Sequence, residues 1–322
     1  MSRDLAQLAL ALWDLDVSGL HLIKQRENAV FRVELAGGGR KALRVHRAGY
    51  HSDAALRSEA QWLGALAEAG LRVPRLVPSR RGHSFERVEG RQVDVLDWVD
   101  GVQLGSVEAG IGDDLAGIAR QYELVGATMA RMHEQAAGWR HGAGFERHSW
   151  CADGLAGEQP LWGRFWELAA LEPAQRTLML RLRDALREDL ARLPRDEGCF
   201  GLIHADLVPE NLLVHQGEVH VIDFDDAGHG WHLFDLATSL YFLQGRPGYG
   251  TARQALVAGY RRHRALPDDS LQALLPMFLA ARGSTYLGWV HERHHTETAR
   301  QLTPQLIELA CAAAGDYLRE RP

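Results

Sequence analysis

The sequence predicts a bilobal α+β fold, in which a small, β-rich N-terminal lobe holds one helix and a larger C-terminal lobe is mainly helical. Three observations lead to this prediction. Runs of β-forming residues are concentrated before residue 100, whereas apolar spacing typical of helices dominates the chain after Gly101. The length of 322 residues also suits about two domains of about 150 residues each. We therefore expect lobes of residues 1–100 and 101–322.

The N-terminal lobe opens with strands predicted at 22–35 and 41–46, which are rich in apolar and β-branched residues. Three consecutive glycines at 37–39 provide the backbone freedom that a hairpin between these strands needs. Side chains alternate across a strand, so Arg44 and Lys41, an odd number of residues apart, point to opposite faces.

A helix is predicted over 52–69, because a Ser-Asp pair opens it and a glycine follows its end. Glu59 lies three residues from both Leu56 and Trp62, which places a carboxylate on the apolar face. A buried carboxylate needs a partner, and we expect that partner to be Arg44. The alternative is a solvated Glu59 at the edge of the apolar face.

A second β-like run, 93–99, ends at Asp100-Gly101, which is a turn signal and a break in composition. Beyond it, apolar residues recur at helical spacing. The predicted helices cover 113–137, 161–193, 231–243, 251–263 and 268–319.

The most informative segment is 204–226, which contains Asp206, Asn211 and Asp223 at characteristic intervals. Transfer of a γ-phosphoryl group needs a carboxylate near the attacking hydroxyl and oxygen ligands for Mg²⁺. These three side chains can supply both. The alternative is that they are turn residues flanking an ordinary hairpin, a common use of Asp and Asn.

The spacing also predicts how two of these residues meet. Apolar-rich runs at 212–215 and 218–222 are joined by Gln216-Gly217, a plausible two-residue hairpin turn. Such a hairpin would fold Asp223 back beside Asn211. The sequence therefore predicts a shared metal site.

This segment resembles the aminoglycoside phosphotransferase and choline kinase superfamily, the small-molecule relatives of protein kinases. That family has a catalytic loop His-Gly-Asp-x-x-x-x-Asn, a metal-binding Asp in an Ile-Asp-Phe context, and an Asp-Leu-Ala on the following helix. The matching residues are His204, Asp206, Asn211, Asp223 and Asp235-Leu236-Ala237, and Ala205 replaces the usual glycine.

The resemblance implies a protein-kinase-like fold that uses ATP and Mg²⁺. It also implies that Asp206 orients the acceptor hydroxyl or accepts its proton, and that Asn211 and Asp223 bind the metal ion. The pattern from Asp223 to Asp235 is most similar to the branch that holds bacterial stress-response kinases, type II homoserine kinases and hydroxylysine kinases.

By the same resemblance, Arg44 stands where the family has the phosphate-binding lysine, held by Glu59. The only lysines are Lys24 and Lys41, and Lys41 faces the wrong side of its strand. Arginine and lysine are not interchangeable at phosphates, because one is a planar fork and the other a point charge. This departure brings the rate into question more than the reaction.

The resemblance also suggests where the rest of the nucleotide binds. No G-x-G-x-x-G precedes the first strands, and the corresponding turn is the polar segment 26–28. Asn28 is the candidate for a phosphate contact, or else simply a turn residue. The hinge is expected at 96–101, where the backbone around Trp98 and Val99 would face the adenine.

For the acceptor, Arg282, Tyr286, Trp289 and Arg293 follow a helical spacing that puts them on one face. A carboxylate-bearing acceptor such as homoserine or hydroxylysine would suit this face, and a polycationic aminoglycoside would not. Ordinary helix packing is the alternative. Asp225 is an auxiliary candidate for metal or substrate binding, or else a solvent-facing residue.

The interval between Asp223 and Asp235 indicates the class of acceptor. It is short and lacks the long activation segment and the A-P-E motif of protein kinases. This favours a small-molecule hydroxyl acceptor. A Ser/Thr protein kinase of the stress-response type and an inactive nucleotide-binding pseudokinase remain alternatives. His133 and Asp235 are expected to be structural supports of the catalytic loop.

A rival motif, His291-Glu292-Arg293-His294-His295, matches the H-E-x-x-H helix of zinc proteases. Its internal positions are charged rather than apolar, and no clear third ligand follows. We therefore expect a solvated helix face here.

The composition excludes several other classes. The net charge of −6 argues against a general nucleic-acid binder. Three widely spaced cysteines imply no disulfide framework. The sequence shows no N-terminal signal pattern and no apolar run of about 18 residues, so we expect no membrane association and a cytoplasmic location.

Overall fold

The computed structural model of the protein describes residues 3–25, 28–106 and 110–321. The chain forms two compact units. The first contains Met1–Val102, Trp139–Arg147 and Leu213–Asp225, and the second contains Gln103–Gly138, His148–Leu212 and Asp226–Pro322. Two segments from later in the sequence thus join the first unit, in addition to the N-terminal residues that the sequence assigned to it.

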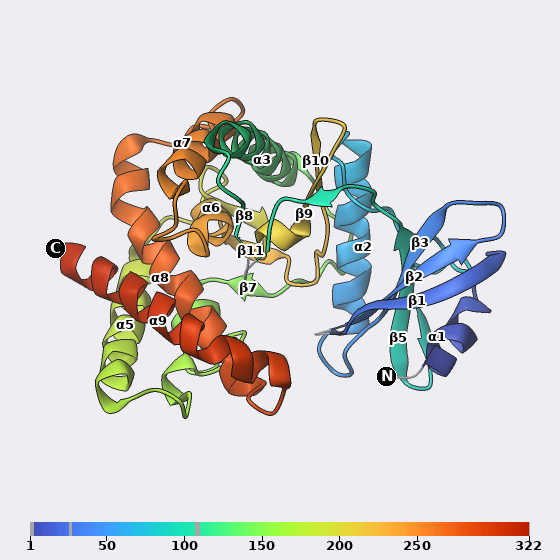
Figure 1. The fold of residues 1–322 in the computed structure, drawn as a ribbon, viewed down its shortest axis with the longest axis horizontal. Helices are drawn as coiled ribbons and strands as arrows, with labels where there is room; N and C mark the ends of the chain where they lie inside the picture. The colour runs from blue at the N-terminus through green and yellow to red at the C-terminus, as the bar shows by residue number, and fades with distance from the viewer. Residues whose placement is uncertain (1–2, 26–27, 107–109, 322) are drawn as a thin grey trace. The chain divides into compact units, whose positions relative to one another are not determined.

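An antiparallel sheet of five strands, in the order β1-β2-β3-β5-β4, forms the first unit (Figure 1). Its strands are β1 (Val17–Gln25), β2 (Ala29–Leu35), β3 (Arg40–Val45), β4 (Glu86–Val88) and β5 (Arg91–Asp97). The run predicted as one strand at 22–35 is divided between β1 and β2, so that prediction is wrong in its extent. The predicted glycine turn is confirmed, since Gly38 and Gly39 both have φ of 86°.

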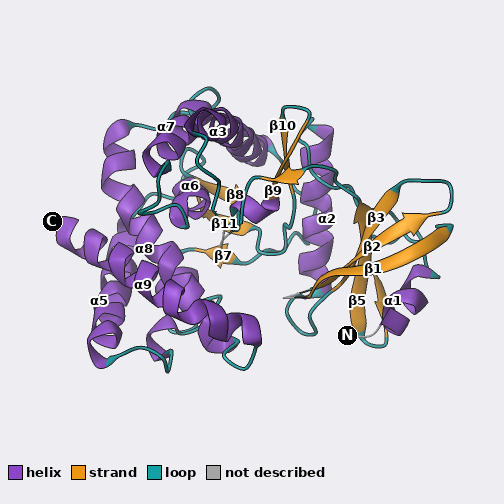
Figure 2. Ribbon diagram, viewed as in Figure 1, coloured by secondary structure: helices purple, strands orange, loops and turns teal. Residues whose placement is uncertain are grey.

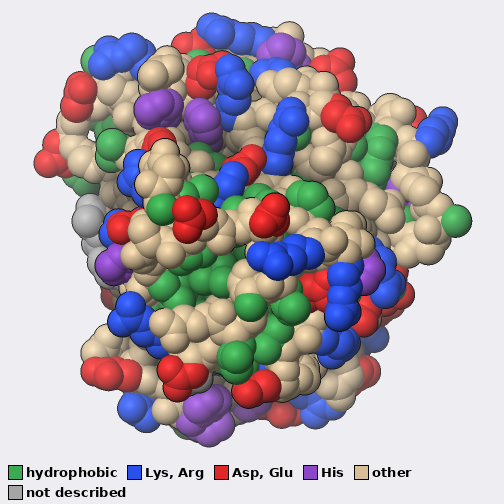
Figure 3. Space-filling view, turned by 90° about the vertical axis from the view of Figure 1, so that its right-hand side faces the viewer, with side chains coloured by type: hydrophobic (Ala, Val, Ile, Leu, Met, Phe, Trp, Pro, Cys, Tyr) green, Lys and Arg blue, Asp and Glu red, His purple; other side chains and the backbone are tan. Residues whose placement is uncertain are grey.

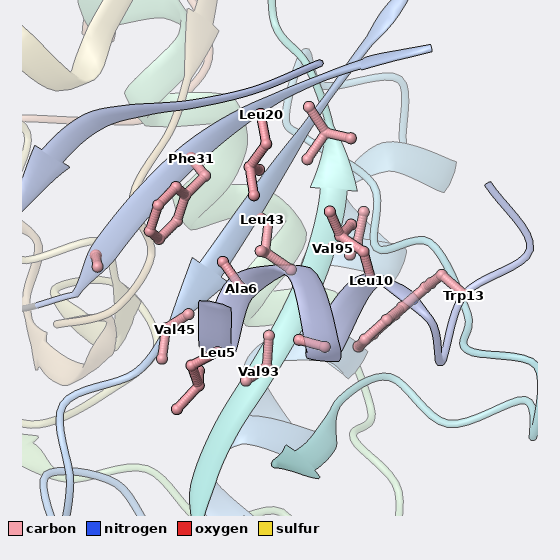
Figure 4. Close-up of a cluster of buried hydrophobic side chains, with 13 residues drawn as sticks. Leu5, Ala6, Leu10, Trp13, Leu20, Phe31, Leu43, Val45, Val93 and Val95 are labelled. Carbon is pink, nitrogen blue, oxygen red and sulfur yellow. The ribbon is translucent and has the colours of Figure 1, made fainter. Parts of the chain in front are cut away.

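The core of the first unit lies between this sheet and α1 (Arg3–Leu10), a helix that the sequence did not predict. Figure 4 shows Leu10 of α1 beside Val95 of the sheet, and Leu5 near Val45 and Val93. Because β3 alternates, its residue Arg44 points to the opposite face.

Helix α2 (Asp53–Glu68) confirms the predicted helix. It begins after Ser52, whose side chain accepts a hydrogen bond from the Ala55 N–H, as an N-cap should. Its buried Trp62 meets Phe224 edge to face, with ring centroids 5.5 Å apart. This contact is one way in which the late segment Leu213–Asp225 packs into the first unit.

The predicted hairpin is also confirmed, by β9 (Leu212–His215) and β10 (Glu218–Val221). Gln216 and Gly217 have φ of 50° and 79°, the two positive values that a type I′ turn requires. Strand β9 lies between β10 and β6 (Val102–Gln103) in a small sheet.

The second unit is mainly helical (Figure 2). Its helices are α3 (Leu115–Gly138), α4 (Ala152–Ala156), α5 (Pro173–Arg192), α6 (His232–Tyr241), α7 (Tyr249–Tyr260), α8 (Asp268–Glu292) and α9 (Glu297–Glu320), with 3₁₀ turns η1 (Phe165–Glu167) and η2 (Pro209–Asn211).

Three of the predicted helices, 113–137, 231–243 and 251–263, correspond to α3, α6 and α7. The helix predicted over 161–193 begins only at Pro173, because Glu172 and Gln175 form a capping box there. The span 268–319 is two helices, α8 and α9, and the second starts after the N-cap Thr296.

A short sheet of order β7-β11-β8 positions the predicted catalytic segment in the second unit. It contains β7 (Ser149–Trp150), β8 (Phe200–Ile203) and β11 (Gly228–Trp231), and Gly228 pairs with Ile203. Because β8 ends at Ile203, His204 to Asp206 leave the sheet directly beside this pair.

On the face drawn in Figure 3, acidic and basic side chains are interspersed, and hydrophobic side chains gather near its centre. The mixed charges on this face differ from the basic stripe that general nucleic-acid binders present. Of the helices that the structure describes, none has the length and apolarity needed to cross a membrane.

Candidate active site

Asp235, a fully buried residue of α6, anchors the loop that follows β8. Its carboxylate accepts hydrogen bonds from the backbone N–H groups of His204, at 3.0 Å, and Ala205, at 2.7 Å. Ala205 has φ of 64°, a left-handed conformation that costs an L-residue about 1–2 kcal/mol. Asp235 therefore anchors a strained loop, and its predicted structural role is confirmed.

Asp235 is in turn supported by His133 of α3, which is fully buried. The His133 imidazole bonds Asp235 Oδ2 through Nε2 and the Tyr260 hydroxyl through Nδ1, each at 3.0 Å. Burial and the charge of Arg264 hold the pKa of His133 well below its usual value, so the ring is neutral at ordinary pH. A neutral ring can donate to the carboxylate and accept from the hydroxyl. The structural role predicted for His133 is confirmed.

The carboxylate of Asp206 is fixed at both oxygens. Oδ2 accepts a hydrogen bond of 2.9 Å from Asn211 Nδ2, and Oδ1 accepts one from Arg282 Nη2. The side chain is nevertheless 21% exposed, so it is open to solvent. Each carboxylate oxygen has two acceptor sites, which leaves Asp206 able to accept a further hydrogen bond.

Asn211 ends the turn η2, and its amide is oriented by the loop. Nδ2 donates to both the backbone oxygen and the side chain of Asp206, at 2.9 Å in each case. This orientation turns Oδ1 away, and that oxygen accepts no hydrogen bond recorded among the described residues. An amide oxygen is a suitable ligand for a hard cation such as Mg²⁺, so Asn211 fits the predicted metal-binding role.

Arg282 of α8 is completely buried against the same loop. Besides Asp206, it donates to the Ala205 backbone oxygen at 3.0 Å and to the Tyr286 hydroxyl at 2.7 Å. Burial opposes its charge, but Tyr286 and Asp206 raise the pKa of the guanidinium above its usual value. Arg282 is thus a charged residue directed at the catalytic loop, and it is closed to contact with a carboxylate on the acceptor.

Three aromatic rings surround this guanidinium. Its central carbon lies 4.3 Å from the ring centroid of Tyr286, 4.7 Å from that of Trp162 and 5.7 Å from that of Phe234. Trp162 is itself held by a hydrogen bond of 3.0 Å from Nε1 to Asp226 Oδ1. Neither Trp162 nor Asp226 was singled out from sequence, because no local pattern joins them to α8.

The other half of the predicted acceptor face has different contacts. Trp289 carries the Arg293 guanidinium over its ring at 5.2 Å, and Arg293 is 7% exposed. The burial of Arg282, Tyr286 and Arg293 is what the alternative, ordinary helix packing, predicts. Arg282 and Tyr286 serve the catalytic loop, whereas a substrate role for Trp289 stays a prediction.

In the first unit, Arg44 forms the predicted ion pair with Glu59, at 2.9 Å between Nη2 and Oε1. Glu59 is 2% exposed, so the solvated alternative is wrong. A second carboxylate, Asp94, lies opposite Arg44 in the β3–β5 register and accepts from Nε at 2.9 Å and Nη2 at 2.7 Å. Nη1 makes no hydrogen bond recorded among the described residues, so it is suited to meet a phosphate.

Two histidines and Asp225 extend this buried group. His46 Nε2 lies 2.9 Å from Asp94 Oδ2, and His51 Nε2 lies 3.3 Å from Asp225 Oδ1. Burial opposes the charge on Asp94, but Arg44 and His46 outweigh it and hold the pKa of Asp94 at about 2. Asp225 is 3% exposed, so the alternative that it faces solvent is wrong. Its role in metal or substrate binding stays a prediction.

The same balance acts on His46 and Asp225. Burial would lower the pKa of His46, but Asp94 raises it above the ordinary value. Burial would raise the pKa of Asp225, but the contacts with His51 and His46 lower it. The Arg147 side chain, 2% exposed, adds a second cation 3.7 Å from Glu59.

The remaining nucleotide-site predictions stay untested. Arg26 and Glu27 lie outside the described residues. Asn28 is buried and accepts a hydrogen bond of 3.1 Å from the Arg47 N–H, which is typical of a turn-stabilising asparagine. Trp98 and Val99 directly follow β5 and are partly buried. Asp223 is exposed, with a left-handed φ of 68°.

The rival zinc motif is not on a single helix. Helix α8 ends at Glu292, and residues up to the cap Thr296 form a turn. His291 and His295 therefore lack the one-turn helical spacing that the motif requires. In the part of the chain that the structure describes, no group of three or more His, Cys, Asp or Glu side chains is arranged to hold a metal ion.

Comparison with known proteins agrees with this geometry. The model of the phosphotransferase enzyme family matches residues 20–268. A homoserine kinase from Rhodopseudomonas palustris is 31% identical, over 68% of this chain and 62% of its own length.

Two solved structures are similar along nearly the whole chain. A microcompartment-associated aminopropanol kinase has a TM-score of 0.85 and 31% identity, covering 99% of this chain and 98% of its own. An amicoumacin kinase in complex with AMP-PNP and Ca²⁺ has a TM-score of 0.78 and 22% identity, covering 97% and 93%. These matches confirm the predicted protein-kinase-like α+β fold.

Proposed function

Since the chain belongs to the phosphotransferase enzyme family, it is a kinase acting on a small-molecule hydroxyl with ATP as donor, and we propose that its acceptor is an amino alcohol. The similar structure of an aminopropanol kinase supports this class of acceptor. The similarity to homoserine kinases supports a hydroxy amino acid instead. The two classes differ in one group, the carboxylate.

The observation that carries the proposal is the commitment of Arg282 to the catalytic loop. With no exposed surface, this guanidinium cannot bind an acceptor carboxylate. Burial opposes the charge of Arg282, but Tyr286, Asp206 and Asp226 raise its pKa. Burial is the main cause that raises the pKa of Tyr286, and the charges of Asp206 and Glu210 add to it, so carboxylates lie close to this pair. Glu210 and Asp226 are each 8% exposed. An ammonium group complements such surroundings, whereas a second carboxylate is repelled.

For the remaining residues we propose the roles that the sequence predicts. Asp206 orients the acceptor hydroxyl and takes its proton. Asn211 and Asp223 are the proposed oxygen ligands of Mg²⁺, which neutralises phosphate charge when it is bound. Arg44, held by Glu59, contacts the phosphates through Nη1, and the backbone near Trp98 and Val99 faces the adenine.

The alternatives have less support. The names of the similar proteins given above indicate small-molecule acceptors and lend no support to a protein substrate. A pseudokinase would not require the oriented contacts among Asp206, Asn211 and Arg282. The cytoplasm, where ATP is abundant, remains the proposed location.

The test is ADP release with Mg²⁺-ATP across aminopropanol, ethanolamine and choline, and in parallel homoserine and hydroxylysine. The proposal predicts a kcat/KM at least about tenfold higher for the best amino alcohol, the effect of about 1.4 kcal/mol of discrimination. A higher kcat/KM for homoserine or hydroxylysine would show that the acceptor carries a carboxylate.

A further inference from the structure

Arg282 makes more contacts with the catalytic loop than a packing residue needs. Its Nη2 reaches the Asp206 carboxylate and its Nη1 reaches the Ala205 carbonyl oxygen at 3.0 Å. One rigid guanidinium therefore bonds the side chain of the predicted base and the peptide group that precedes it. A planar fork can make these contacts simultaneously, whereas a point charge cannot.

These two contacts are made at Asp206 and at Ala205, whose strained backbone needs support from other residues. Ala205 has a left-handed φ of 64°, where the family uses glycine. Asp235 holds the N–H of this residue, at 2.7 Å, and Arg282 holds its carbonyl oxygen. The strained residue is thus fixed on both sides, and Asp206 follows it directly.

Aromatic side chains restrict the directions in which the Arg282 guanidinium can donate hydrogen bonds. The rings of Tyr286 and Trp162 lie 4.3 and 4.7 Å from its central carbon, and they cover its faces without offering strong acceptors in its plane. The Nη1 and Nη2 donors are left for the loop and for the Tyr286 hydroxyl, while Nε makes no hydrogen bond recorded among the described residues. Because Arg282 is 0% exposed, neither water nor acceptor competes for them.

From these contacts we propose that Arg282 is a positioning residue, which sets the orientation of the Asp206 carboxylate toward the acceptor hydroxyl without touching the acceptor itself. The inference rests on the proposed kinase reaction but not on the identity of the acceptor. A misplacement of about 1 Å at a reacting group can cost about 100-fold in rate. Loss of Arg282 should therefore lower kcat and leave both KM values nearly unchanged.

The experiment compares the wild-type protein, Arg282→Ala and Arg282→Lys, using whichever acceptor the wild type phosphorylates. We expect kcat to fall about 100-fold in Arg282→Ala, with KM for acceptor and for ATP within threefold. Guanidinium ion at millimolar concentration should restore part of kcat in Arg282→Ala, whereas sodium at the same ionic strength should not. Arg282→Lys should lose at least tenfold, because an ammonium group cannot hold both loop contacts.

Arg183→Ala is the matched control. Arg183 also lies over a tryptophan ring, 4.2 Å from the centroid of Trp166, and pairs with the carboxylate of Glu158, but it contacts no catalytic-loop residue in any recorded interaction. Its kcat should stay within twofold of the wild type, with no response to guanidinium.

Two outcomes would overturn the inference. The first is a kcat within threefold of wild type in Arg282→Ala, and the second is a loss confined to the acceptor KM. If Arg282→Ala does not fold, Arg282→Lys decides, and a wild-type kcat in that variant overturns the inference. A wild-type protein that releases no ADP with any acceptor would instead contradict the proposed function.

Discussion

Arg44 in the first unit and Arg282 in the second are both buried cations, but they are held by opposite kinds of surroundings. Arg44 lies between two carboxylates, Glu59 and Asp94, with His46 bonded to the same Asp94. Arg282 lies among the rings of Trp162, Tyr286 and Phe234 and has one carboxylate partner, Asp206. Charged side chains surround Arg44, whereas mostly aromatic rings surround Arg282.

The difference shows how each cation can be used. Two carboxylates more than balance the charge of Arg44, so its position is fixed firmly and only one nitrogen is left for a phosphate. The rings around Arg282 stabilise a cation without neutralising it. Among the described residues its recorded ion pair is with Asp206, which suits a residue that positions the predicted base.

The largest expected effect comes from breaking the charged surroundings of Arg44. Asp94→Asn removes a buried anion from Arg44 and His46, and we expect a loss of about 3–5 kcal/mol in the free energy of unfolding. The measurement is urea unfolding followed by tryptophan fluorescence.

Asp97→Asn is the matched control on the same strand. Asp97 pairs with Lys41 of β3, but the two side chains are 44% and 24% exposed, so its loss should cost about 0–1 kcal/mol. Equal destabilisation by the two substitutions would show that the Arg44 surroundings are not held by charge.

A smaller effect is expected when Arg44 is replaced by the residue usual in the family. Arg44→Lys keeps the charge but cannot bond both oxygens of Asp94 and reach Glu59, which leaves a buried acceptor unsatisfied at a cost of about 1–3 kcal/mol. Mg²⁺-ATP affinity, measured by calorimetry, should fall as well. Arg40→Lys, at an exposed pair with Asp100, should change neither quantity. Unchanged stability and affinity in Arg44→Lys would mean that the guanidinium fork is dispensable.

The protonation of His46 provides a third test. Its pKa is raised in the folded state, chiefly by Asp94 against the effect of burial. Its contribution to stability is therefore complete below the unfolded pKa of about 6.5 and is lost as pH rises through the folded value. Each unit by which the pKa is raised contributes about 1.4 kcal/mol. His46→Gln should flatten the pH dependence of stability above pH 6.5, and an unchanged slope would assign it to other groups.

The smallest effect is expected at the loop that Arg282 holds. Ala205→Gly relieves a left-handed residue and should stabilise the fold by about 1 kcal/mol in thermal unfolding. Ala313→Gly, within the helix α9, should instead destabilise by about 1 kcal/mol. Destabilisation in both variants would show that Ala205 is unstrained.

What the sequence could predict is local. The catalytic loop, the Gln216-Gly217 turn and helix α2 each depend on residues within a few positions of one another, and propensity and spacing describe such elements well. The pairing of Arg44 with Glu59 was accessible too, because helical periodicity placed Glu59 on the buried face.

The partners that the sequence did not predict come from distant segments. Asp94 meets Arg44 only through the β3–β5 register, and Asp206 meets Arg282 only through the packing of α8 against the loop. One signal was present: Asp94 interrupts an apolar strand, and a buried carboxylate needs a cation. The break between α8 and α9 was missed although the residues between these helices are polar and Thr296 gives an N-cap signal for α9.

We propose that Asp206 is the residue through which this kinase acts on its acceptor. The most direct measurement is acceptor-stimulated ADP release by the wild type and by Asp206→Asn, with Mg²⁺-ATP binding measured on both proteins by calorimetry. We expect Asp206→Asn to bind nucleotide normally and to lose at least about 100-fold in kcat, the contribution of general base catalysis. A folded Asp206→Asn protein that keeps full acceptor-stimulated activity would contradict it.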